Sequence, residues 1–466
     1  MHVLKENSFC TFTLPFIFES EQLQQRAESF DGNTMKSYWK SHQFNDDELV
    51  EGVLANECSD EELDPDIRVW RLSNEGLRDW SGLGAEWKLL IKKGKPGEKK
   101  IQFDFQSVTL SMFSTGVCFL SLKVSLKSNS YSDWIDFMHY FRFSDRPKLA
   151  SLHGIRKLPQ KAYDHFSKSK QSPDAPEVRE PLGFEFEGTL HERIYLLLAN
   201  ENDRQEWWKT TYVSGQLVPF FCLLTDECDD VSAYQELYQL RNFFHSNSYL
   251  APSKSDLAEN HAGIREYCES QWFVFSRDGG GYYSRNPPNH PFFKQTICDH
   301  VSDHYFLMFL LVLHQRFHIS TNLKNIAVEW GRKSASRGHE ALERLKEIDL
   351  WYSSRFQLGQ IAQNDHHQSF YNKWQETFSI RSEFNELKHK VNETQLSVYS
   401  DRQRRIENRI NLFGALLGLP ALVASVMSVN VIGLSANEGW HCNDFKIAIG
   451  LSIVAGFLWF YCFLRH

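Results

Sequence analysis

The sequence lacks the motifs of several common classes of protein. None of its nine cysteines is part of a CxxC motif, so neither a zinc ribbon nor a disulfide framework is indicated. No Walker motif and no Ser-His-Asp or Cys-His arrangement stands out, and we therefore expect no enzyme. The formal net charge of -8 argues against a surface dominated by nucleic-acid binding.

Charged residues are missing from two long runs near the C-terminus. The first extends from Ile410 to Asn437 and the second from Ile447 to Leu464. A helix of about eighteen residues rises roughly 27 Å, which is enough to cross the hydrocarbon core of a bilayer. A buried hairpin in a soluble core is the alternative, but such helices rarely reach this length without a charge. We expect transmembrane helices at 410–434 and 447–464, joined by an extracytoplasmic loop at 435–446.

The charges that flank these runs predict their orientation. The loop carries Glu438 and Asp444 against Lys446. Basic residues lie at the outer ends of the two runs: Arg402, Arg404, Arg405, Arg409 and Arg465. The positive-inside rule then keeps both termini in the cytoplasm, and residues 1–30 lack the pattern of a signal peptide. We expect an integral protein of the bacterial inner membrane.

Residues 1–320 have the alternating pattern of a mixed α/β cytoplasmic domain. Apolar runs rich in β-branched and aromatic residues predict strands at 12–18, 108–126, 194–199, 217–225 and 271–277. Helical spacing predicts helices at 131–143 and 232–244, and the segment 278–281 (DGGG) predicts a hairpin turn. A polar stretch near 165–182 would divide the domain into two lobes, and 251–263 predicts a further loop.

Proline is also missing between Pro291 and Pro420. Residues 321–409 are highly charged and helix-forming, which predicts a long helical stalk packed on itself or on neighbouring subunits. The last stalk helix begins near Ser379 and meets no break before the first apolar run. The expected fold class is an α/β cytoplasmic domain followed by long stalk helices and two C-terminal transmembrane helices.

Small and polar residues recur at alternating spacings of three and four along the first apolar run. They are Asn411, Gly414, Gly418, Ala421, Ser425 and Ser428. This spacing places them on one face of a helix, which we call the small-residue seam. The seam could allow close helix packing, or it could line a pore formed by several copies. Both are compatible in an oligomer, because two spans of one chain cannot enclose a water-filled path.

The segment Glu407–Asn430 (ENRINLFGALLGLPALVASVMSVN) resembles the CorA family of pentameric magnesium channels. Pro420 matches the proline within the family's first span. Asn430 matches the asparagine of the Gly-Met-Asn filter, although the tripeptide here is Ser428-Val429-Asn430. The resemblance implies a homopentamer that conducts divalent cations such as Mg²⁺, needs no cofactor and has Asn430 among its pore-lining residues.

Other features have both an ordinary and a functional explanation. Carboxylates of Glu438 and Asp444 from several copies would gather cations at a pore entrance. The acidic stretch 46–66 is either a solvated loop or a cation sensor between subunits. Two histidine pairs have the i, i+4 spacing of metal ligands, but the apolar run between them favours packing: His300, His304, His314 and His318.

Three function classes remain, of which a membrane-anchored enzyme is the least favoured because no catalytic arrangement stands out. The expected function is a CorA-like membrane channel for cations that works as a homo-oligomer. The alternative is a membrane effector gated by a cytoplasmic small molecule or partner that the large N-terminal domain senses.

Overall fold

The computed structural model describes residues 1–17, 39–42, 67–82, 85–92, 99–143, 146, 150–156, 184–198, 209–210, 216–226, 233–248, 250–258, 261–331 and 364–434. The chain divides into two compact units. One is formed by residues 1–325 and 350–387, and the other by residues 326–349 and 388–466. All strands of the described residues belong to the first unit.

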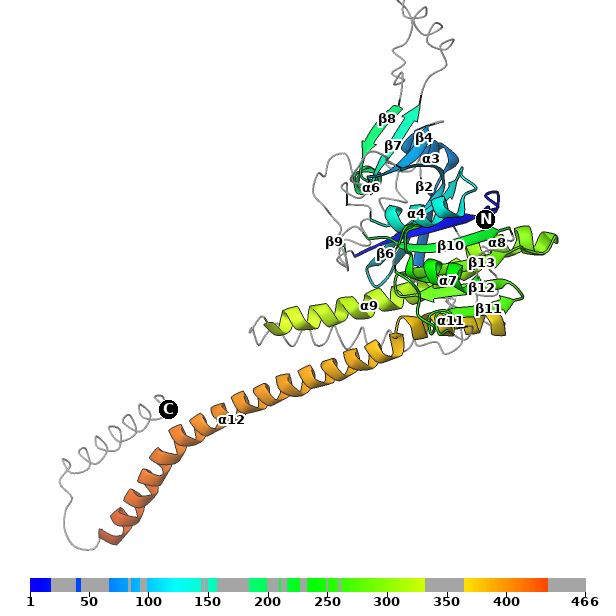
Figure 1. Cartoon of the computed structure of the whole chain (residues 1–466). Helices are drawn as coiled ribbons and strands as arrows, with labels where there is room; N and C mark the ends of the chain where they lie inside the picture. The colour runs from blue at the N-terminus through cyan, green and yellow to red at the C-terminus, as the bar shows by residue number, and fades with distance from the viewer. Residues whose placement is uncertain are drawn as a thin grey trace, which may run out of the picture. The chain divides into compact units, whose positions relative to one another are not determined.

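Thirteen strands of the described residues form one mixed sheet, in the order β11-β12-β13-β10-β1-β6-β5-β4-β7-β8 (Figure 1). Off this path, β2 pairs with β3, β3 with β5 and β9 with β1. Neighbouring strands are antiparallel except β10 and β13. The strands are β1 (Phe9–Ile17), β2 (Trp39–Ser41), β3 (Ile67–Leu72), β4 (Glu86–Ile91), β5 (Lys99–Phe113), β6 (Val117–Leu126), β7 (Ala150–Arg156), β8 (Phe184–Gly188), β9 (Lys209–Thr210), β10 (Val218–Thr225), β11 (Ile264–Cys268), β12 (Gln271–Ser276) and β13 (Gly279–Arg285).

Helices connect some of these strands and follow the last one. They are α3 (Asn74–Ser81), α4 (Tyr131–Phe141), α6 (Leu190–Leu198), α7 (Ala233–Asn242), α8 (Ile297–His300), α9 (Phe306–Gly331), α11 (Asp365–Thr377) and α12 (Ile380–Leu434). Two π-helical turns, η1 (Phe292–Thr296) and η2 (Val301–Tyr305), lie on either side of α8. The segment from Phe292 onwards is therefore one helical stretch with two wide turns.

Helices cover both faces of the sheet, because successive residues of a strand point to opposite sides. On one face, Phe12 packs against Phe137 and Phe141 of α4, with ring centroids 6.0 and 4.6 Å apart. On the other face, Phe220 packs against Phe309 of α9 at 5.0 Å. Strands buried on both sides read as continuous apolar runs, as β10 (VPFFCLLT) does.

The expected fold class, with two C-terminal transmembrane helices, is wrong. Within the described residues, the one helix long and apolar enough to cross a membrane is Phe292–Asn325 in the middle of the chain, and 67% of its apolar window is buried. Phe309 lies between Phe220 of the sheet and Trp374 of α11, at 5.0 and 4.8 Å. A helix that packs between two neighbours has apolar residues on all sides because it is buried in protein, so its composition does not require a membrane. The predicted second span and its loop, residues 435–464, lie outside the described residues.

Several predicted segments are confirmed. Strands β10 and β12 correspond to 217–225 and 271–277, and helices α4 and α7 correspond to 131–143 and 232–244. The predicted hairpin is present between β12 and β13, but its turn is Arg277 and Asp278, because residues 279–281 already belong to β13. The described part of 251–263 contains no helix or strand. The divisions predicted near 165–182 and the acidic stretch 46–66 lie outside the described residues.

The predicted strand 108–126 is two strands, β5 and β6, which form a hairpin. Gly116 has a φ of 86° in the turn between them, a conformation that glycine adopts without steric cost. The apolar residues on both sides of this short turn conceal it in the sequence. A hairpin therefore replaces the single long strand.

The predicted strand 194–199 is wrong, because residues 190–198 form helix α6. The helix begins with a capping box. The Thr189 backbone N–H donates to Glu192 Oε2 at 2.9 Å, and the Glu192 N–H donates to Thr189 Oγ1 at 3.2 Å. The Thr-x-x-Glu spacing was a helix-start signal that outweighs the strand-like composition of ERIYLLL.

The long helix predicted from about Ser379 is confirmed as α12, which has 55 residues. Its first turns are part of the first unit, where Ile380, Phe384 and Leu387 are buried. From Lys388 the same helix belongs to the second unit. One continuous helix is thus shared by the two units.

Candidate functional site

Most of the exposed large apolar side chains in the described residues lie on α12. Leu396, Tyr399, Ile406, Ile410 and Phe413 have exposed fractions of 69, 47, 48, 62 and 62%. Their spacing follows a heptad repeat, with Leu396 and Ile410 at a positions and the other three at d positions. Single exposed apolar residues are ordinary, but a row of them along one helix marks an interaction surface. We call these five residues the α12 stripe.

Polar residues lie within and beside the stripe. Gln403 occupies the a position in its middle, and its Nε2 donates to Glu407 Oε1 at 3.0 Å. A single polar residue at an a position fixes the register of a coiled coil. Glu407 is at an e position, whereas the sequence places Arg402 and Arg409 at g positions. The two flanks of the stripe therefore differ in charge.

The predicted pore-lining residues lie on the same helix. Asn411, Gly414 and Gly418 are exposed, and a Cβ added at either glycine would meet nothing within 4 Å. The remaining seam residues are within α12, but their side chains lie outside the described part of the chain: Ala421, Ser425, Ser428 and Asn430. Glu438 and Asp444 of the predicted entrance lie outside the described residues altogether. The described end of the seam is open to another copy.

The histidines His314 and His318 are packing residues of the core. His314 stacks on Phe113 with ring centroids 4.0 Å apart and shares a hydrogen bond of 2.7 Å with Thr115 Oγ1. Burial lowers the pKa of His314, and it lowers the pKa of His318 to about 4, so that both are neutral at pH 7. Among the described residues, no group of three or more His, Cys, Asp or Glu side chains could hold a metal ion.

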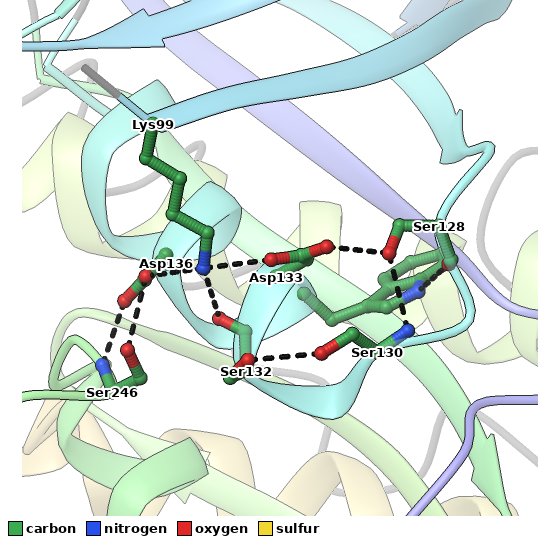
Figure 2. Close-up of polar contacts among 8 residues, drawn as sticks. Lys99, Ser128, Ser130, Ser132, Asp133, Asp136 and Ser246 are labelled. Carbon is green, nitrogen blue, oxygen red and sulfur yellow. Dashed lines mark hydrogen bonds and ion pairs between the residues drawn. The ribbon is translucent and has the colours of Figure 1, made fainter. Parts of the chain in front are cut away.

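A network centred on Lys99 joins three segments that are distant in sequence. Figure 2 shows the Lys99 ammonium at the start of β5 between two carboxylates of α4. Lys99 Nζ lies 2.7 Å from Asp133 Oδ1 and 2.7 Å from Asp136 Oδ2, and 3.4 Å from the Ser132 carbonyl. Asp136 also accepts the backbone N–H and the hydroxyl of Ser246, at 2.7 and 3.0 Å. The network ties the sheet to α4 and to the segment after α7.

The electrostatics of this network indicate a structural role. Burial would raise the pKa of the Asp136 carboxyl, but the hydrogen bonds from Lys99 and Ser246 outweigh it and hold the pKa below its usual value. Burial would lower the pKa of Lys99, yet its bonds to Asp133 and Asp136 raise it. The three N–H groups of Lys99 have three acceptors, so the ammonium has no donor left for a substrate. No local pattern in the sequence indicates these long-range pairs.

No known family, curated protein or solved structure matches the chain. Among the features described above, the α12 stripe is the row of large apolar side chains that is exposed in the described part of the chain.

Proposed function

We propose that the chain is a homo-oligomeric effector whose copies associate through parallel α12 helices, with the sheet-containing first unit as its regulatory part. The observation that carries the proposal is the row of five exposed apolar side chains at heptad spacing on α12. Burying one such side chain is worth about 1.5–3 kcal/mol. A second copy presents an identical stripe and can bury the whole row at once.

Charge favours parallel rather than antiparallel association. In a parallel coiled coil, a g residue of one helix faces the e residue five positions later in its neighbour. The sequence places Arg402 at g and Glu407 at the matching e position. In the same arrangement, Gln403 of each copy meets Gln403 of the others, which keeps the helices in register.

The identity of the core residues favours more than two copies. Leucine at a with isoleucine at d shifts coiled coils from dimers to larger assemblies, and Leu396 and Ile406 hold these positions. Five copies is the number that the resemblance to CorA implies. The first unit is linked to the assembly because α12 begins among its buried residues, so a change in that unit can be passed along the helix.

Mass measurement of the purified chain in mild detergent tests this function. Replacing Ile406 and Ile410 by aspartate would bury two charges at the interface, and we expect the dissociation constant to rise at least about 100-fold, equivalent to about 2.7 kcal/mol. The control is Asn408→Asp, which adds one negative charge on the opposite side of the helix, at an f position.

The result expected is an oligomer for the wild type and the control, and a monomer for the double variant. A monomeric wild-type chain would refute the proposal. An oligomer that survives both aspartates would show that copies associate through another surface.

Cation conduction is the second candidate, as the output of the assembled effector. It is favoured by the exposed Asn411, Gly414 and Gly418, which adjoin the stripe and offer an amide and open backbone to an ion. The preference for Mg²⁺ comes only from the resemblance to CorA. Flux of Mg²⁺ into liposomes that contain the protein should be blocked by Gly418→Leu while the oligomer persists. Normal flux through an intact Gly418→Leu oligomer would remove the seam from the pathway.

A further inference from the structure

Polar side chains interrupt the apolar surface on the α9 side of the sheet. Residues that are directly opposite in antiparallel strands project to the same face. Thr13, Ser121, Thr109 and Arg71 are such partners across β1, β6, β5 and β3. Lys123 lies two residues beyond Ser121, opposite Thr11 and Ser107 in the next row. We call these seven residues the hydroxyl patch.

Lys123 is the unusual member of the patch, because it is the one charged residue of β6 (VCFLSLKVSL). Its Nζ lies 2.6 Å from Ser302 Oγ of η2 and 4.0 Å from the centroid of the Phe9 ring. Its neighbours Thr11 and Ser107 are 5% and 8% exposed. An ammonium in such a place costs free energy unless an anion accompanies it.

The described residues supply no ion-pair partner for Lys123. Asp299 and Asp303 act on it only at longer range, and neither comes within ion-pair distance in the part of the chain that the structure describes. Burial lowers the pKa of Lys123, with Asp303 acting in the opposite direction. The ammonium is therefore a charged group with a shifted pKa and with no carboxylate in direct contact among the described residues, and groups with perturbed pKa values cluster at functional sites.

Further features near the hydroxyl patch are typical of a binding site. Ser111, two residues along β5 from Thr109, is fully buried, and its hydroxyl has no hydrogen-bond partner within the described residues. Arg71 is exposed at the β3 edge of the patch and forms no ion pair with a described residue, so a second cation is accessible from solvent. The helical segment above the patch contains the turns η1 and η2, and π-helical turns recur at functional sites.

We propose that the hydroxyl patch binds the phosphate group of a small molecule, with Lys123 and Arg71 as the cationic contacts. Phosphate oxygens accept hydrogen bonds, and the patch offers an ammonium, a guanidinium and several hydroxyls, of which Thr13 Oγ1 and Ser121 Oγ share a hydrogen bond of 3.2 Å. The guanidinium suits a bidentate contact, and the partly buried ammonium gains an anion in direct contact. The inference rests on the proposed function only in that it gives the regulatory unit a ligand.

Thermal unfolding of the full-length chain tests the site, at constant ionic strength, with inorganic phosphate, adenosine monophosphate or succinate added. A ligand that binds the folded state raises Tm. We expect both phosphates to raise the Tm of the wild type and succinate to leave it unchanged. The rise should be lost in Lys123→Met, which keeps the length of the side chain, and reduced in Arg71→Gln.

Lys127→Met is the matched control, because Lys127 follows the same strand but is half-exposed and paired with Asp104 at 3.2 Å. The phosphate-induced rise should persist in this variant. Without ligand, Lys123→Met should unfold no earlier than the wild type, since it removes a partly buried charge. The site would be refuted if phosphate raised the Tm equally in all variants, if succinate raised it as well, or if phosphate did not raise it in the wild type. The mass of the oligomer tests the proposed function separately.

Discussion

Two buried carboxylates in the first unit have pKa values that are shifted in opposite directions. Asp136 is fully buried and accepts three hydrogen bonds, from Lys99 and from the backbone and side chain of Ser246. Glu236 is 2% exposed, and Tyr283 donates its hydroxyl to one carboxylate oxygen, while the other oxygen has no partner in the described residues. Burial therefore raises the pKa of Glu236, whereas hydrogen bonds lower that of Asp136.

Replacing Asp136 by asparagine should destabilise the first unit. Hydrogen bonds to a charged group contribute about 1.5–3 kcal/mol each, so we expect a loss of about 3 kcal/mol at pH 7 in urea unfolding. The folded pKa of Asp136 is lowered, so its contribution is present above the usual carboxyl pKa of about 3.9 and is lost as the pH falls further. The variant should approach the wild type in acid. Asp104→Asn, at an exposed pair, is the control and should cost under about 1 kcal/mol.

Replacing Glu236 by glutamine should have the opposite effect. A carboxyl with a raised folded pKa is most favourable in acid, and its contribution to stability falls as the pH rises through that pKa. At pH 7 the neutral amide avoids the cost of a buried charge and can still accept the Tyr283 hydroxyl. Urea unfolding at pH 7 should give a more stable variant, and the gain should shrink as the pH falls through the raised pKa of Glu236. A variant that is less stable at pH 7 would show that the charge is compensated.

At the scale of elements, the sequence located most of the buried segments and missed features that depend on pairing. Composition was enough for β10 and β12, whose inner residues are all apolar. Composition wrongly predicted a strand at residues 194–198, where the capping box of Thr189 and Glu192 begins a helix. It also could not reveal the hydroxyl patch, because Lys123 and Arg71 are brought together only by the strand order β6-β5-β3. Register is a property of the sheet and not of any one strand.

Replacing glycine by alanine should change the free energy of unfolding in opposite directions at two positions. A Cβ at Gly281 of β13 would lie 2.0 Å from the carbonyl oxygen of Phe221 in the parallel neighbour β10, and its φ is 155°. Gly281→Ala should therefore cost about 3 kcal/mol or more. Gly414→Ala in α12 meets no atom within 4 Å and should gain up to about 1 kcal/mol from helix propensity. Denaturant unfolding of both variants checks this, and equal effects would contradict the close approach of β10 and β13.

At the scale of the whole molecule, the candidate assembly surface was only partly visible in the sequence. The small-residue seam was found because glycine, serine and asparagine stand out in an apolar run. The α12 stripe was missed because arginines surround Ile406 and Ile410, so the segment read as a charged stalk. The spacing of the stripe residues indicates an interaction surface only because their side chains are exposed, since the same spacing on a buried helix would be ordinary core packing.

The division of α12 between the two units leads to a last prediction. A chain that ends after Lys390 keeps Ile380, Phe384 and Leu387, which are buried in the first unit, and loses the whole stripe. Because the sheet and the helices on both its faces lie within the first unit, we expect this shortened chain to unfold cooperatively, as the intact unit would. It should be a monomer in light scattering where the full-length chain is an oligomer. It should also keep the phosphate-induced rise in Tm, since Lys123 and Arg71 remain. A shortened chain that still assembles would place the contact between copies on the sheet-containing unit and would refute the role of the stripe.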